Sequence, residues 1–199
     1  MVIVVPLLVL YLRGNWPLRA IIASLFIIPP LWYLTYAPLH ELSHAVGTYA
    51  VRGKVIYYKL IPSFWAGEFG RAWITTQGLN QNWQQLISTS FPYIADCVSI
   101  AIGFRVLRRG FSSNPFVIGL AFMLLCLRPA FDFVCEPIAL LLGDKGDLYA
   151  IQEIIGCVPT WAFIFLSFAL SVLSIGGVLR RFAGYPENFP GGQESSLQS

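Results

Sequence analysis

Charged residues are scarce in this 199-residue chain, in which Asp, Glu, Lys and Arg together make up 12% of the sequence. Soluble domains carry about 25% charged residues, so a chain with half that share cannot cover a small globule with charge. The formal net charge of +3 is also too small to indicate a nucleic-acid partner. Both shortages argue against a soluble domain and favour a lipid bilayer as the surrounding medium.

Paired cysteines are absent as well. No CxxC pair occurs, and the first three of the four cysteines lie inside apolar segments: Cys97, Cys126, Cys135 and Cys157. Free cysteine packs as a small buried hydrophobe, so we interpret all four as packing residues. They do not identify the redox compartment.

Long apolar runs are what the chain has instead: 56% of its residues are hydrophobic, and its mean hydropathy is +0.66. Four segments are long enough for the ~30 Å hydrocarbon core of a bilayer, at about 18–51, 83–107, 115–142 and 158–179. Residues 1–12 are apolar, but a helix of that length covers only ~18 Å. We therefore predict an all-α, multi-pass integral membrane protein with four to five transmembrane helices, in a single domain over residues 1–182.

The stretches between these runs predict smaller elements. Residues 55–76 hold two runs of β-branched and aromatic residues around a turn, which predicts a β-hairpin or loop at the membrane face. A short interfacial helix is expected to begin with Asp147 as its N-cap. Pro29, Pro30 and Pro38 should kink or break the first long run. The tail over 183–199 is rich in Gly, Pro, Ser and Gln, and we expect it to be disordered.

Basic residues mark the ends of the long runs. If each run crosses the bilayer once, seven arginines share one face, namely Arg13, Arg19, Arg105, Arg108, Arg109, Arg180 and Arg181. Five basic residues share the other face, namely Arg52, Lys54, Lys59, Arg71 and Lys145. The excess predicts that the first face is cytoplasmic.

Histidine occurs only twice, as His40 and His44, four residues apart with Glu41 between them. Side chains at i and i+4 lie on one face of a helix, so both imidazoles can bind one Zn²⁺ ion. In the HExxH arrangement the glutamate is the general base that activates the zinc-bound water. Ionisable groups at membrane depth are costly unless they are paired or functional, and we therefore predict a zinc site.

A catalytic zinc site needs a third protein ligand. At a rise of 1.5 Å per residue, His40 and His44 lie ~18 and ~12 Å from the end of their run, and Asp132 lies ~16 Å from the same face. Asp132 is therefore our first choice for the third ligand, although an ion pair with Arg128 would also explain an aspartate inside an apolar segment. Two further carboxylates remain open as ligands, in this order: Asp147 and Asp96.

The segment APLHELSHAVGTYAVRGKV resembles the metal-binding helix of site-2-protease-like intramembrane zinc metallopeptidases, in particular their short M50B-like branch. The match covers both histidines and the glutamate and continues through Gly53, Lys54 and Val55. In that family a later aspartate completes the zinc site. The segment RPAFDF supplies Asp132 for this role, and GDLYAIQEIIGCVPTW resembles a later element with Asp147 as its acidic position.

The resemblance implies a zinc-dependent endopeptidase that cuts membrane proteins or peptides in or beside the bilayer. Zn²⁺ would be held by His40, His44 and either Asp132 or Asp147, with Glu41 as the general base and the 55–76 hairpin near the substrate entrance. The alternative hypothesis is a catalytically inactive protein of the same fold that binds metal or a partner. A metal-ion transporter fits less well, because it needs polar ligands throughout the membrane and the sequence has one such cluster.

Overall fold

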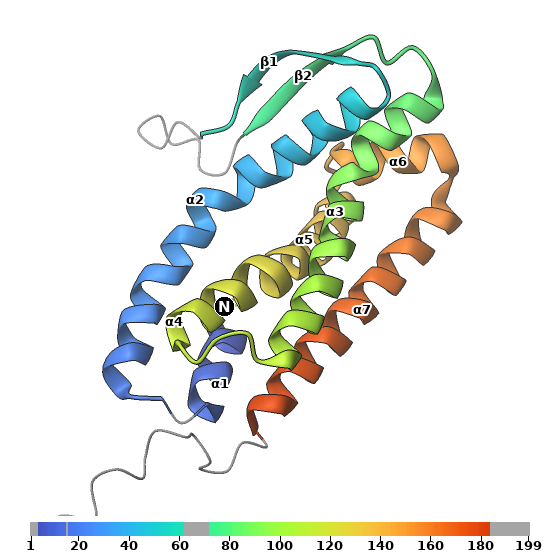
Figure 1. Cartoon of the computed structure of the whole chain (residues 1–199). Coiled ribbons are helices and arrows are strands. Elements are labelled where there is room, and N and C mark those ends of the chain that lie inside the picture. The colour runs from blue at the N-terminus through green and yellow to red at the C-terminus, as the bar shows by residue number, and fades with distance from the viewer. Residues whose placement is uncertain (1–3, 15, 62–71, 184–199) are drawn as a thin grey trace, which may run out of the picture.

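The computed structural model describes residues 4–14, 16–61 and 72–183, which form helices and one small sheet (Figure 1). In chain order the elements are α1 (Val4–Arg13), α2 (Leu18–Ala50), β1 (Lys54–Lys59), β2 (Trp73–Gln77), α3 (Asn82–Arg109), α4 (Pro115–Phe122), the π-helical segment η2 (Met123–Leu127), α5 (Arg128–Leu141), α6 (Asp147–Ile155) and α7 (Cys157–Ala183). The predicted hairpin turn and the predicted tail from residue 184 fall outside the described ranges.

Four helical stretches are long and apolar enough to cross a bilayer: α2, α3, the continuous run from α4 to α5, and α7. They coincide with the four segments predicted from the sequence, whereas α1 has only 10 residues. Their outward faces expose large apolar side chains, such as Phe26 (77% exposed), Leu166 (72%) and Leu173 (73%). A continuous apolar surface of this kind suits contact with lipid better than contact with water.

Helix α2 runs unbroken for 33 residues through Pro29, Pro30 and Pro38. The sequence predicted a kink or a break at these prolines, and the break does not occur. Each proline removes one helical hydrogen bond, but α2 packs extensively against α3, and tertiary packing of this kind outweighs local propensity. As a result His40 and His44 keep the spacing of one turn on a single helix face.

Helix α3 is the centre of the bundle and packs against α2, α4, η2, α5, α6 and α7. Two buried apolar clusters surround it. One lies near α1 and includes Leu7, Leu10, Tyr11, Phe122 and Met123. The other lies under α6 and includes Tyr93, Ile100, Phe133, Leu148 and Ile151. The second cluster anchors the short helix α6 to the long helices.

The two ends of the bundle differ (Figure 1). One end carries α6 and the antiparallel pair β1–β2, whose register runs from Lys54 opposite Gln77 to Lys59 opposite Trp73. This pair confirms the predicted hairpin. The opposite end carries α1 and the C-terminal ends of α3 and α7. The end with the hairpin is the one where the HExxH residues lie, in the last third of α2.

Candidate metal centre

Two histidines and one aspartate converge where α2 meets the start of α6. His40 and His44 point from one face of α2 to Asp147, the first residue of α6. The Oδ2 atom of Asp147 lies 3.0 Å from Nε2 of His40 and 2.8 Å from Nε2 of His44. Both histidines are buried, and the Asp147 side chain is 28% exposed. The same nitrogen of each ring therefore faces one carboxylate oxygen that solvent can still reach.

The second nitrogen of His44 contacts helix α3. Its Nδ1 lies 3.0 Å from the backbone carbonyl oxygen of Ser88. In a helix this carbonyl would accept from the amide four residues later, but that residue is Pro92, which has no amide hydrogen. The freed carbonyl accepts the Nδ1 proton of His44. Nε2 of the same ring donates a hydrogen bond to the Asp147 carboxylate, and loss of that proton would free its lone pair for a metal ion.

The second nitrogen of His40 faces a different acceptor, the fully buried carboxylate of Asp132 on α5. The distance between Nδ1 of His40 and Oδ2 of Asp132 is 3.5 Å. Both atoms are buried, and neither has a hydrogen bond to another group within the described residues. A proton on Nδ1 faces this carboxylate as a charge contact, while Nε2 of His40 donates a hydrogen bond to Asp147 and would have to lose that proton to bind a metal ion. Partners of this kind, on the far side of a ligating imidazole, orient the ring and raise its basicity.

Asp132 is itself held by two neighbours. The Tyr36 hydroxyl donates a hydrogen bond to its Oδ1 atom, and Nη1 of Arg128 lies 3.7 Å from its Oδ2 atom. Nη2 of Arg128 contacts Oδ1 of Asp96, on α3. These polar groups lie deep among apolar helices, where an unpaired charge would be costly. The network fixes Asp132 behind the His40 ring.

The carboxylate of Asp147 is kept ionised. Burial alone would raise its pKa, but hydrogen bonds and charge interactions with His40 and His44 outweigh this effect and bring the pKa below its usual range. An ionised carboxylate is the form that binds a metal ion. Asp147 is therefore in the protonation state that a ligand requires at neutral pH.

The three side chains fit a zinc ion by type and by spacing. One ligand-type atom from each of His40, His44 and Asp147 lies within 4.8 Å of the other two. Ligands at about 2.0–2.1 Å from one tetrahedral zinc ion lie roughly 3.3 Å apart, so the contacts of 2.8 and 3.0 Å need to widen only slightly. Two imidazoles and one carboxylate also form a known type of catalytic zinc site, with the fourth position open.

A scan against family models, a search of curated proteins and a search of solved structures found no match to this chain.

A cavity of about 860 Å³ adjoins the three side chains. Glu41, His44 and Asp147 line it together with residues of β2, α3 and α6, including Ile74, Ser88 and Tyr149. Ile74, in β2, lines the same cavity as the Glu41 carboxylate. The predicted general base and two of the candidate ligands therefore face one shared space.

The three candidate third ligands lie in three different places relative to the histidine rings. Asp147, the alternative, faces Nε2 of both histidines. Asp132, the first choice, lies at Nδ1 of His40, and Asp96 is paired with Arg128. The expectation that Asp147 caps its helix is wrong: Gly146 occupies the N-cap position. The Asp147 side chain bonds the histidines instead, because α6 packs on α3 beside them.

The sequence did not lead us to two supporting groups, the Ser88 carbonyl and the Tyr36 hydroxyl. The Ser88 carbonyl carried a signal, because a proline four residues after it in a helical segment predicts a freed backbone acceptor. Tyr36 carried a weaker signal: it precedes His40 by one helical turn, so it lies on the same face. Neither signal indicates which side chain would use the group, and that depends on how α2 packs against α3 and α5.

Proposed function

We propose that this protein is an integral membrane zinc metallopeptidase that hydrolyses peptide bonds of membrane-embedded or membrane-adjacent substrates. One observation carries the proposal: the two Nε2 atoms of the HExxH histidines converge on a single oxygen of Asp147. The resemblance of the α2 sequence to site-2-protease-like enzymes supports the same function. The four long apolar helices support its location in a membrane.

Three residues would hold the metal ion in this proposal, namely His40, His44 and Asp147. Ser88 and Asp132 would keep the two imidazoles in the tautomer that presents Nε2. When bound, Zn²⁺ would lower the pKa of a coordinated water to about 7 and polarise the carbonyl group under attack. The preorganised ring orientations favour binding, because little side-chain freedom is lost when the ion enters.

Glu41 would act as the general base. It directly follows His40 on α2 and lines the cavity with His44 and Asp147. Its carboxylate would take a proton from the attacking water and pass it to the leaving amine. Ile74 and Thr76 of β2 line the same cavity, so the hairpin lies beside the proposed base.

The unpaired edge of β2 would position the substrate. Within the described residues β2 pairs only with β1, which leaves its other edge without a neighbouring strand. Trp73, Ile74, Thr76 and Gln77 of this strand line the cavity. An extended peptide that adds to this edge would pass Glu41, as in other cases of strand addition. Substrates would therefore have to be locally unwound before cleavage.

A second reading is a protein that uses the same cluster without catalysis. Asp147 already satisfies both Nε2 atoms by hydrogen bonds, so the cluster is also consistent with a purely structural ion pair. The two readings differ in zinc content. A structural cluster needs no metal, whereas the peptidase requires one zinc ion per chain.

The test compares the purified full-length protein with two variants in detergent. Zinc content is measured by mass spectrometry, and cleavage is measured with a quenched-fluorescent library of transmembrane-segment peptides. Glu41→Gln should keep one zinc per chain and lose cleavage by about 100-fold or more. Glu153→Gln is the matched control, because Glu153 lines the same cavity from α6. A wild-type protein without stoichiometric zinc would refute the proposed function.

A further inference from the structure

The bundle end opposite the metal centre is rich in arginine. The last turns of two long helices meet there, with Arg108 and Arg109 at the end of α3 and Arg180 and Arg181 at the end of α7. The carboxylates of the described residues lie at mid-helix or near the hairpin end, as Glu41, Asp96, Asp132, Glu136, Asp144, Asp147 and Glu153. Within the described part of the chain, basic side chains therefore outnumber acidic ones at this end.

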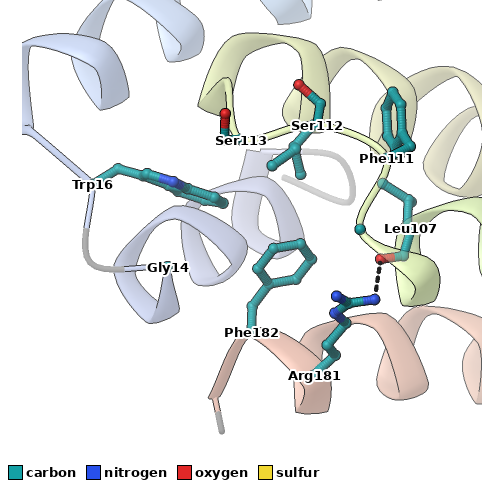
Figure 2. A pocket seen from close by; sticks show the side chains of 10 residues that line it. Gly14, Trp16, Leu107, Phe111, Ser112, Ser113, Arg181 and Phe182 are labelled. Atoms are coloured by element: carbon teal, nitrogen blue, oxygen red, sulfur yellow. Dashed lines mark hydrogen bonds between the residues drawn. The ribbon is translucent and has the colours of Figure 1, made fainter. Parts of the chain in front are cut away.

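Two cavities lie at this end and share one arginine. The first, of about 300 Å³, has aromatic walls from Trp16, Phe111 and Phe182, and Arg181 lies at one side of it, bonded to the Leu107 carbonyl (Figure 2). The hydroxyl-bearing residues Ser112 and Ser113 complete its rim. The second cavity, of about 460 Å³, is lined by Arg108, Gly177, Arg180 and Arg181. One cavity is thus largely aromatic and its neighbour largely cationic.

Two of the three arginines around the cationic cavity are held in place by other groups. Nη1 of Arg181 donates a hydrogen bond to the backbone carbonyl of Leu107, 3.2 Å away. The guanidinium of Arg108 stacks over the ring of Phe104, 5.1 Å from its centroid. Gly177 lets that ring approach α7, because a Cβ atom there would lie 2.6 Å from the ring. Preorganised guanidinium groups lose little freedom when they bind an anion.

We propose that these two cavities form a binding site for the headgroup of an anionic phospholipid. The phosphate would lie among Arg108, Arg180 and Arg181, because guanidinium groups form paired hydrogen bonds with phosphate oxygens. The glycerol and the first part of an acyl chain would lie against Trp16 and Phe182. The ends of apolar helices lie at the headgroup level of a bilayer, where aromatic and basic side chains gather.

The site is more specific than the general excess of basic residues at one membrane face. Arg19 and Arg105 lie at the same end and are exposed, but they line neither cavity. A topology signal depends on the charge of all these arginines alike. A headgroup site depends only on the arginines that line the two cavities. This difference separates the two explanations by experiment.

The experiment uses native mass spectrometry of the delipidated full-length protein, titrated with phosphatidylglycerol or phosphatidylcholine. The wild type should retain one phosphatidylglycerol molecule in preference to phosphatidylcholine. The double variant R108Q/R180Q should bind phosphatidylglycerol about tenfold or more weakly, since each basic residue near a phosphate contributes a large factor. This variant leaves Arg181 and its bond to Leu107 in place.

The control is R19Q/R105Q, which removes the same charge from the same end and should bind as the wild type does. The proposal fails if the control variant loses as much phosphatidylglycerol affinity as R108Q/R180Q does. It also fails if the wild type retains phosphatidylcholine as well as it retains phosphatidylglycerol. Titration with inorganic phosphate forms a second arm: if phosphate alone competes at equal concentration, the site takes free phosphate and the lipid proposal fails. The thermal unfolding midpoint in detergent, measured on each variant, shows whether the bundle is still folded.

Discussion

The Nδ1 atom of His44 lies 3.0 Å from the carbonyl oxygen of Ser88, across the interface between α2 and α3. The carbonyl is available because Pro92, four residues later, cannot donate a hydrogen bond to it. A helix-disrupting residue in α3 thus supplies the group that orients a metal-ligand candidate on α2. The residues that surround this contact yield the predictions below.

Substitution of Pro92 by alanine should weaken zinc binding. The new amide would compete with His44 for the Ser88 carbonyl, and loss of an outer-shell partner typically costs about 10-fold or more in metal affinity. The thermal midpoint should stay the same or rise, because alanine favours a helix interior. Chelator competition measures the zinc affinity, with Pro137→Ala in α5 as the control. Unchanged affinity in Pro92→Ala would show that the Ser88 contact does not orient His44.

Gly47 allows α2 and α3 to approach closely enough for that contact. A Cβ atom at Gly47 would lie 2.6 Å from Cβ of Phe91 and 3.1 Å from Cα of Ser88. Gly47→Ala should therefore destabilise the protein by about 1–3 kcal/mol and weaken zinc binding. The matched control is Gly176→Ala, because nothing lies within 4 Å of a Cβ atom there. Thermal unfolding in detergent should show a lower midpoint for the first variant and an equal or higher one for the second.

Asp147 and Asp132 should differ in how strongly their loss affects zinc. Asp147→Ala removes the proposed ligand and should abolish stoichiometric zinc. Asp132→Asn changes only the group behind the His40 ring and should weaken binding about 10–100-fold. Asp144→Asn, on the exposed loop before α6, serves as the control. The reverse order, with zinc retained by Asp147→Ala and lost from Asp132→Asn, would assign the third ligand to Asp132.

Zinc binding should weaken as the pH falls, and two protons should be taken up for each zinc ion released. Both imidazoles must be neutral to bind zinc, and their ordinary pKa is about 6.5. Asp147 should add no third proton above about pH 5, because its pKa lies below its usual range and its contribution is lost only when the pH falls through that lowered value. Zinc affinity measured between pH 7.5 and 5 should fall up to about 100-fold per pH unit. A dependence on three protons would contradict the assignment of an ionised Asp147.

Much of the fold followed from local pattern. The four long apolar helices lie where the hydrophobic runs predicted them, because a run of that length excludes most alternatives to a helix. Of the kink or break predicted at the prolines of α2, the break does not occur, since packing against α3 is a long-range effect that no local rule contains. The ranking of the three candidate third ligands also depended on long-range packing, which the sequence does not show. Depth along a helix can be counted from the sequence, but the direction in which a side chain points cannot.

The sequence by itself determined the apolar character of the helices and the spacing of His40, Glu41 and His44, because both depend on residues close together in the chain. Only the tertiary structure decided that Asp147 faces the two Nε2 atoms while Asp132 lies behind one ring. The physical reason is that these contacts join α2 to groups more than 90 residues away. Their geometry is set by how α3, α5 and α6 pack together, which depends on the whole set of buried side chains.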